Sequence, residues 1–166
     1  MTIRPAKAAD TVAVIGLMEE AHRRSRYAQV GGVHRETAKA FLVRCVQLHG
    51  HLNAGGTLYL VAEKDGAVTG FFIALLARVY VVGTLLEAQD IFLYMNESAD
   101  RRDFRRCIKA FDNWAQGNPR CIEATLSNSD FIPGAKEILE RIYVRRGYEK
   151  TNNVFKRRFQ PAEAVT

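Results

Sequence analysis

The sequence lacks the features of a disulfide-stabilised or metal-binding domain. It has three cysteines in 166 residues, and none of them forms a C-x-x-C pair. An odd number of cysteines without pairing spacing indicates a reducing compartment, so we expect a cytoplasmic protein with buried thiols. The motif His49-Gly50-His51 has no cysteine or carboxylate at ligand spacing beside it, and we therefore expect no metal site.

Long hydrophobic runs are also missing. The most apolar stretch, Ala67 to Leu86, contains Arg78 and is broken by Gly70 and Gly83, whereas a membrane-spanning helix needs about 20 predominantly apolar residues. The first residues carry only a short apolar stretch, interrupted by Gly16, which does not match a signal peptide. We find no internal repeat and no low-complexity tract. These absences predict one soluble domain over residues 1–160, followed by a flexible tail at 161–166, with no membrane contact.

Hydrophobic periodicity predicts alternating strands and helices. Asp65-Gly66 separates two β-rich runs and predicts a hairpin. We expect strands at residues 3–5, 58–63, 68–82, 87–95 and 121–126, and two further short strands within 148–159. Four segments with apolar residues at helical spacing predict helices: one after Asp10, one over His34 to His49, one from the arginine-rich segment to Gly117, and one over 134–148 that Gly147 ends.

Each predicted helix has an apolar face that should contact the core. The expected core residues are Val14, Leu17, Met18 and Ala21; Ala38, Phe41, Leu42 and Cys45; Phe104, Cys107, Ile108, Phe111 and Ala115; and Ile138, Leu139, Ile142 and Tyr143. Hairpins come first and helices alternate with strands later. This order predicts an α+β, or mixed α/β, domain with a mostly antiparallel twisted sheet of six to seven strands and helices on both faces.

An arginine cluster is the most unusual feature. The segment NESADRRDFRRCIKAFDNWA, residues 96–115, has four arginines within six residues, and the chain has a net charge of +6. Arginines in a first helical turn oppose the helix dipole at a cost of about 0.3–1 kcal/mol each, which Asp100 and Asp103 partly offset. Three interpretations stay open: a phosphate site, a solvated helix face or a nucleic-acid patch. Nucleic acid is disfavoured, because no binding motif is present and Phe104 and Phe111 fall on the core-facing stripe.

Three stretches of the chain resemble the GCN5-related N-acetyltransferases (GNAT), and together they cover most of it. IRPAKAADTVAVIGLMEEAH is similar to the family's opening strand and first helix. AQDIFLYMNESADRRDFRRCIKAFDNWA is similar to its central strand, pyrophosphate loop and following helix. RIYVRRGYEKTNNVFKRRF is similar to its closing stretch, in which Tyr143 is followed four residues later by Gly147-Tyr148. The resemblance implies a single GNAT-like domain.

The loop departs from the family's pattern of Gln or Arg, two residues, Gly, one residue, then Gly or Ala. This chain has no glycine between Asn96 and Arg106. In the family, backbone amides of the loop and helix start hold the pyrophosphate of coenzyme A. Either these amides act without glycine, or arginine side chains contact the phosphates instead. The resemblance therefore implies coenzyme-binding residues Arg101, Arg102, Phe104, Arg105 and Arg106.

The resemblance further implies an acetyl-CoA-dependent N-acetyltransferase that moves an acetyl group directly to a primary amine. The pantetheine arm would pair with the strand backbone around Phe92, Leu93 and Tyr94. Ser127 and Asn128, just after the strand expected at 121–126, would contact pantetheine or the acceptor, or only cap the next turn. Tyr143 would protonate the leaving thiolate, although a purely structural aromatic in the core stripe stays open.

The general base is less defined in the sequence. Asp90 is our candidate, and Glu87 is the alternative. Regular alternation would place Asp90 and Phe92 on the same face of their strand. The acceptor is a small-molecule or protein amine, and the basic segment Ala21 to Ala38 would suit an acidic or neutral one. A catalytically silent binding or regulatory protein with the same fold is the competing interpretation, and homodimerisation stays open.

Overall fold

The sheet is built from short β-rich segments that pair mostly with their neighbours in the chain. A computed structural model describes residues 2–127 and 136–151. In this part of the chain the strands are β1 (Thr2–Pro5), β2 (Thr57–Lys64), β3 (Ala67–Arg78), β4 (Leu86–Met95) and β5 (Cys121–Thr125). Their order in the sheet is β1-β2-β3-β4-β5, with antiparallel pairs up to β4 and a parallel pair between β4 and β5.

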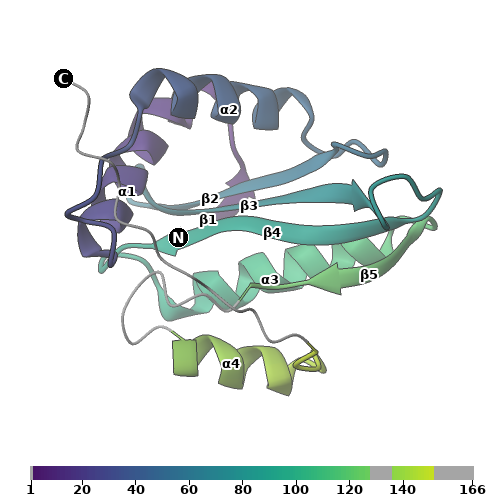
Figure 1. The fold of residues 1–166 in the computed structure, drawn as a ribbon. Coiled ribbons are helices and arrows are strands. Elements are labelled where there is room, and N and C mark those ends of the chain that lie inside the picture. The colour runs from purple at the N-terminus through teal and green to yellow at the C-terminus, as the bar shows by residue number, and fades with distance from the viewer. Residues whose placement is uncertain (1, 128–135, 152–166) are drawn as a thin grey trace.

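Helices cover both faces of this sheet, as predicted. Figure 1 shows α1 and α2 on one face and α3 and α4 on the other. We call these the upper and the lower face. The helices are α1 (Thr11–Arg24), α2 (Arg35–Gln47), α3 (Arg101–Gln116) and α4 (Lys136–Arg145), and a short 3₁₀ turn, η1 (Ala8–Asp10), precedes α1. Within the described residues, no helix is long and apolar enough to cross a membrane.

The sheet has five strands in the described part of the chain, so the expectation of six to seven is not met there. Of the two further strands expected within 148–159, residues 148–151 form no strand, and residues 152–159 lie outside the described residues. The tail expected at 161–166 also lies outside them.

Turn chemistry explains where the hairpin strands begin and end. Asp65 and Gly66 adopt φ angles of 52° and 80°, the left-handed pair that a tight two-residue hairpin needs, so the predicted hairpin is confirmed. The strand expected to reach Val82 ends at Arg78 instead. The side chain of Arg78 donates a hydrogen bond to the carbonyl of Gly83 at 2.9 Å, and this bond closes a turn between β3 and β4.

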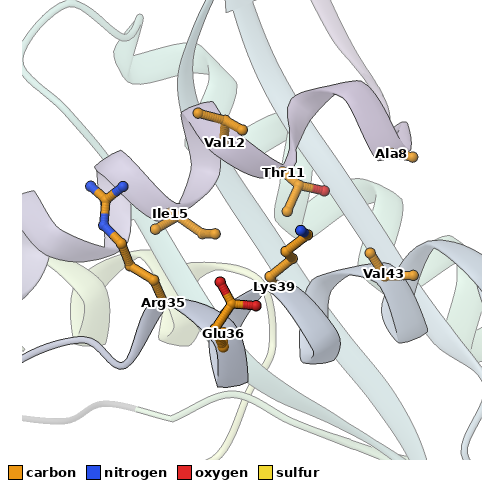
Figure 2. A pocket seen from close by; sticks show the side chains of 8 residues that line it. All are labelled: Ala8, Thr11, Val12, Ile15, Arg35, Glu36, Lys39 and Val43. Carbon is orange, nitrogen blue, oxygen red and sulfur yellow. The ribbon is translucent and has the colours of Figure 1, made fainter.

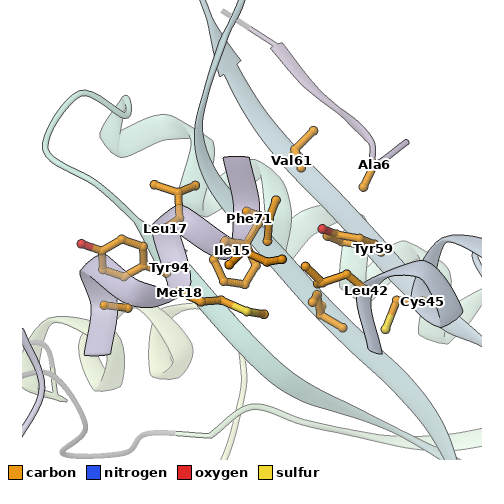
Figure 3. Close-up of a cluster of buried hydrophobic side chains, with 13 residues drawn as sticks. Ala6, Ile15, Leu17, Met18, Leu42, Cys45, Tyr59, Val61, Phe71 and Tyr94 are labelled. Atoms are coloured by element: carbon orange, nitrogen blue, oxygen red, sulfur yellow. The ribbon is translucent and has the colours of Figure 1, made fainter. Parts of the chain in front are cut away.

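Two hydrophobic clusters hold the helices to the sheet. The upper cluster (Figure 3) includes the predicted α1 stripe together with Leu42 and Cys45 of α2, whereas Phe41 is 38% exposed because α2 packs mainly through those two residues. The lower cluster buries Cys107, Ile108, Phe111 and Ala115 of α3, as predicted.

Helix α4 joins the lower cluster through a narrower face than predicted. Tyr143 is its buried residue, Leu139 and Ile142 are half-buried, and Ile138 is 53% exposed. Asp112 of α3 fixes the end of this helix: its carboxylate accepts hydrogen bonds from Arg146 Nε at 3.0 Å and from the Tyr148 hydroxyl at 2.5 Å. Since Tyr143 lies within this anchored segment, its ring has a defined position under the sheet.

Candidate active site

Strands β4 and β5, at one edge of the described sheet, separate partway along β4 and form a fork. Their parallel pairing runs from Leu86 opposite Cys121 to Gln89 opposite Thr125. β4 then continues to Met95 along β3, while β5 ends at Thr125. Among the described residues, no strand pairs with this outer edge of β4 from Asp90 to Met95. An extended ligand can therefore use the backbone groups of that edge.

A β-bulge lies at the mouth of the fork. Ala74 of β3 faces Asp90, and Ile73 faces Phe92, so Ile91 has no partner on β3. A bulge bends its strand and leaves the extra residue outside the hydrogen-bond ladder. It therefore provides backbone groups that are free of the β3 ladder at the point where β4 and β5 part.

The bulge also changes which way the side chains of β4 face. Ala88 belongs to the lower cluster, and Phe92 packs with the upper cluster, where its ring lies 5.1 Å from that of Phe71. Asp90 lies on the lower face together with Ala88, because the two residues are separated by one position and side chains alternate between the faces of a strand. The expectation that Asp90 and Phe92 share a face is therefore wrong, since the extra residue shifts the alternation by one.

Asp90 connects the two branches of the fork. Its Oδ1 accepts a hydrogen bond from the backbone amide of Ser127 at 2.6 Å, just beyond the end of β5. The hydroxyl of Tyr143 donates to the carbonyl of Ser127 at 3.4 Å. The structure thus brings together two side chains, Asp90 and Tyr143, that lie 53 residues apart in the sequence.

Burial tunes both titratable groups. It raises the pKa of Asp90 above its ordinary value of 3.8, and the hydrogen bonds from Ser127 partly oppose this. Burial also raises the pKa of Tyr143 well above its ordinary value of 10, and the nearby Asp90 carboxylate raises it further. The phenol therefore keeps its proton at neutral pH and can act as a proton donor.

Replacing Asp90 by asparagine should change how stability depends on pH. Because the folded pKa is raised, the carboxyl contributes stability below pH 3.8 that is lost as the pH rises through the folded pKa. Asp90→Asn keeps an oxygen acceptor for Ser127 and cannot ionise. We expect its melting temperature to increase relative to that of the wild type between about pH 4 and pH 7. Thermal melts of both proteins across this range measure the effect.

Asp90→Ala serves as the control for this experiment. It removes the acceptor as well as the charge, and a buried amide that loses its partner costs about 1–3 kcal/mol. We expect this variant to be less stable than Asp90→Asn at every pH. Equal melting temperatures for the two variants would contradict a role for Asp90 as the acceptor that holds the fork.

The side chains of the predicted pantetheine-binding residues anchor β4 rather than line its edge. Phe92 and Tyr94 face the upper cluster, and Leu93 packs with the lower one. The Tyr94 hydroxyl donates to Glu20 Oε1 of α1 at 2.8 Å, and Arg24 lies 3.5 Å from the same hydroxyl. The unpaired edge of β4 therefore presents mainly the backbone groups of these residues. Sequence reasoning did not assign Glu20 or Arg24 to this strand, because their contacts with Tyr94 join residues that are 74 and 70 positions apart in the chain.

Glu87 remains available as a second candidate base. It alternates with Ala88 and therefore faces the upper side of the sheet, opposite to Asp90. Gln89 lies on the same side and donates its amide to Glu87 Oε1. The two carboxylates thus approach the fork from opposite faces, and the structure leaves both alternatives in place.

The loop before α3 supplies acceptors for its own amides. Ser98 N donates to Asn96 Oδ1 at 2.9 Å, and Ala99 N donates to the Asn96 carbonyl at 3.2 Å. Asp100 is the N-cap of α3: its Oδ1 accepts from Arg102 N at 2.8 Å, and its carbonyl accepts from Asp103 N at 2.9 Å. Four amides at the place where a pyrophosphate would bind are already satisfied by the chain itself.

The predicted arginines take different positions around the start of α3. Arg102 and Arg105 are exposed, and Arg106 pairs with the fully buried Asp103 at 2.9 Å. The second carboxylate oxygen of Asp103 has no hydrogen-bond partner among the described residues. Phe104 is half-buried and its ring stacks 6.5 Å from that of Tyr143.

The side chains of two predicted site residues are not described. Asn128 lies outside the described residues, and of Arg101 only its backbone position at the first turn of α3 is described. In the described part of the chain, no group of three or more histidine, cysteine, aspartate or glutamate side chains is arranged to hold a metal ion.

A separate groove of about 410 Å³ lies between α1 and α2, away from the fork (Figure 2). Its walls combine apolar side chains with Arg35, Glu36 and Lys39. None of the predicted site residues lines it. The groove has no side chain in common with the Asp90–Tyr143 arrangement, so it is not part of this candidate site.

Comparisons with known proteins identify the fold through structural similarity rather than through sequence. No protein-family model matches the chain, and no curated protein matches it in sequence. The aminoglycoside N-acetyltransferase AAC(6′)-Iy, solved in complex with the bisubstrate analogue CoA-S-monomethyl-acetylneamine, is similar with a TM-score of 0.66 and 20% identity. The match covers 96% of this chain and 97% of that one.

Two further solved structures support the same fold. The ribosomal-protein-alanine N-acetyltransferase of Brucella melitensis biovar Abortus 2308 has a TM-score of 0.64 at 18% identity, covering 95% of this chain and 98% of that one. An acetyltransferase of Trypanosoma brucei has a TM-score of 0.65 at 10% identity, covering 95% and 99%. The chain therefore has the GNAT fold that its sequence resemblance predicted, and these low identities show the fold alone.

Proposed function

We propose that this protein is an N-acetyltransferase that moves an acetyl group from the pantetheine thioester of acetyl-CoA to a primary amine. The observation that carries this proposal is the fork of β4 and β5: the Ile91 bulge lies on β4 next to Asp90, and the hydroxyl of Tyr143 lies 3.4 Å from the carbonyl of Ser127, whose amide donates to Asp90. An unpaired strand edge, free backbone groups and a protonated phenol are the parts that thioester transfer to an amine requires.

The residues at the fork fit the arm of the donor. The edge of β4 from Asp90 to Met95 offers backbone hydrogen bonds to an extended pantetheine, which supplies the reactive thioester. The bulge at Ile91 offers a backbone amide that can polarise the thioester carbonyl. Tyr143 donates a proton to the sulfur as the carbon–sulfur bond breaks, and Glu87 or Asp90 accepts the proton that the amine loses.

The residues at the start of α3 do not fit the pyrophosphate of the donor in the family's usual way. The amides of Arg102 and Asp103 already donate to Asp100. We therefore assign no step to this loop, and the donor is held mainly by its arm.

The acceptor is expected to be neutral or acidic. The end of α1 and the following segment carry Arg23, Arg24 and Arg26, and Arg24 lies 3.5 Å from the hydroxyl of Tyr94 on β4. Clustered cations repel a polycationic amine and attract an acidic one. An acidic acceptor should therefore react faster than spermidine, and similar rates for the two would count against this assignment.

Release of free thiol from acetyl-CoA tests the proposed function. The purified protein is mixed with acetyl-CoA and a panel of acidic, neutral and polycationic amines, and the thiol is followed with a chromogenic reagent. We expect amine-dependent release at about 1 mM acetyl-CoA, the upper end of ordinary KM values. No release with any amine, together with no calorimetric binding of acetyl-CoA, would instead support a catalytically silent protein with this fold. The loop before α3 favours this alternative, because four of its amides already donate to acceptors within the chain.

A further inference from the structure

The backbone amides at the start of α3 offer little to a compact anion. Asn96 and Asp100 already accept four amide hydrogen bonds, from Ser98, Ala99, Arg102 and Asp103. Asp100 and Asp103 also place two carboxylates at this end of the helix. A pyrophosphate at the same place would compete with Asp100 for the amides and would be repelled by its carboxylate.

The outer face of α3, by contrast, is strongly basic. Arg102, Arg105 and Lys109 are exposed and follow one another at spacings of three and four residues, so they lie on one side of the helix. None of the three forms an ion pair with any residue that the structure describes. With a rise of 1.5 Å per residue, the row extends over about 10 Å, which suits charges spread over a surface better than a single phosphate group.

The fork and this basic face are connected by the geometry of β4. An arm that starts at Asp90 and follows the strand to Met95 covers five residue steps, or about 17 Å. Its outer end then leaves the sheet next to residues 96–100, which lead directly into the first turn of α3. Whatever carries the arm must therefore lie close to Arg102 and Arg105.

We propose that the preferred donor is a pantetheine thioester attached to an acidic carrier protein, which docks on the basic face formed by Arg102, Arg105 and Lys109. This inference rests on the proposed acyl transfer at the fork. A carrier of this kind presents the same arm as coenzyme A, but it spreads its carboxylates over a surface rather than concentrating charge in a pyrophosphate. Charge complementarity then supplies the contact that the loop amides do not.

The reaction is balanced with this donor. A bond forms between the acceptor nitrogen and the acyl carbon, and the bond between that carbon and the sulfur of the arm breaks. The sulfur receives the proton of Tyr143 and leaves as the free thiol on the carrier. The acceptor nitrogen releases one proton to Glu87 or Asp90, and a proton from solvent restores the Tyr143 phenol, so no oxidant or further reactant is needed.

Three donors that share the same acetyl thioester test the proposal. These are an acidic acyl carrier protein loaded with acetyl-phosphopantetheine, acetyl-CoA, and S-acetylpantetheine, which lacks both protein and nucleotide. We expect kcat/KM with the loaded carrier to exceed that with acetyl-CoA by about tenfold or more at low salt, and this advantage should shrink as salt increases. Acetyl-CoA and S-acetylpantetheine should differ by less than about threefold.

A charge-reversal pair identifies the docking face. In Arg102→Glu/Arg105→Glu, we expect activity with the carrier-borne donor to decrease about 100-fold more than activity with S-acetylpantetheine. Lys39→Glu/Arg44→Glu, on exposed positions of α2 at the opposite face of the sheet, makes the same change in net charge and serves as the matched control. Melting curves of both double variants verify that each one is folded.

Three results would overturn the proposal. The first is a preference of about 100-fold or more for acetyl-CoA over S-acetylpantetheine, which would mean that the nucleotide is bound firmly. The second is an equal loss of carrier-dependent activity in the two double variants. The third is binding of nucleic acid, but not of the carrier, to Arg102 and Arg105.

Failure of the proposed function gives a different pattern. If no donor acylates any amine, acyl transfer itself is excluded. Binding of the fluorescently labelled carrier without its arm, measured by anisotropy, still tests the basic face of α3 independently of catalysis. Binding that the Arg102→Glu/Arg105→Glu variant loses and the α2 control keeps supports the docking face, and equal binding by all three proteins overturns it.

Discussion

Replacing Tyr143 with phenylalanine should lower kcat about 100- to 1,000-fold, with little change in the binding of the donor. Removal of a positioned general acid typically costs 10²–10⁴-fold, and Tyr143 has the only phenol that approaches Ser127 at the fork within the described residues. The fold should be nearly unaffected, because the hydroxyl makes only a long contact of 3.4 Å to the carbonyl of Ser127. Steady-state kinetics by thiol release, together with calorimetric titration of acetyl-CoA, separate the two effects.

Tyr148→Phe is the matched control, since the two rings lie 6.1 Å apart and both belong to the lower layer. The hydroxyl of Tyr148 donates to Asp112 of α3 at 2.5 Å rather than to Ser127 at the fork. Its loss should destabilise the protein by about 1–2 kcal/mol while kcat stays within about threefold. Equal kinetic effects of the two substitutions would mean that Tyr143 has only a structural role.

The pH dependence should distinguish this proton donor from an ordinary surface tyrosine. Burial and the charge of Asp90 raise the pKa of Tyr143 above its ordinary value of 10. A group with a raised pKa keeps its proton until the pH exceeds that value, so Tyr143 should cause no loss of kcat up to about pH 10. A basic limb that begins near neutral pH and disappears in Tyr143→Phe would contradict this assignment.

Deleting Ile91 should preserve the fold and reduce kcat by about 100-fold or more. In the native strand, Asp90 faces the lower side and Phe92 the upper side, with Ile91 as the extra residue between them. Removing that residue leaves Asp90 directly before Phe92, so regular alternation keeps every following side chain on its native face. What disappears is the bulge and its backbone amide, and loss of one such donor typically costs 10²–10³-fold in kcat.

Ile91→Ala is the control for the deletion. The Ile91 side chain is 43% exposed, so trimming it keeps the bulge and should leave kcat within about threefold of the wild type, with at most a small change in stability. Melting temperature and thiol release are measured for both variants. A deletion variant that unfolds would refute the regular-alternation argument, and one that keeps full activity would refute a catalytic role for the bulge.

The order of elements and most of the core follow from local patterns. Asp65-Gly66 predicted its hairpin because a tight turn needs two left-handed residues, and both adopt positive φ. The α3 stripe of Cys107, Ile108 and Phe111 is fully buried because its spacing matches the helical period. These patterns act over a few residues, so one-dimensional reasoning can detect them.

Patterns failed where a contact with a distant segment changed the local structure. The bulge at Ile91 depends on the register with β3, and it reversed the expected face of Asp90 relative to Phe92. The exposure of Phe41 and Ile138 depends on how α2 and α4 lie on the sheet, not on their spacing alone. The Asn96 and Asp100 acceptors fill a loop that the resemblance assigned to a ligand.

The sequence by itself determined the helices, the hairpin, the basic first turns of α3 and the resemblance of the chain to the GNAT fold, because each depends on residues that are near one another in the chain. Only the tertiary structure decided that β4 and β5 part at Gln89, that Asp90 binds Ser127 across the gap, and that Tyr143 reaches the same point. Strand register and packing angles are set by many contacts between residues that are distant in the sequence, so a local sequence pattern cannot predict them.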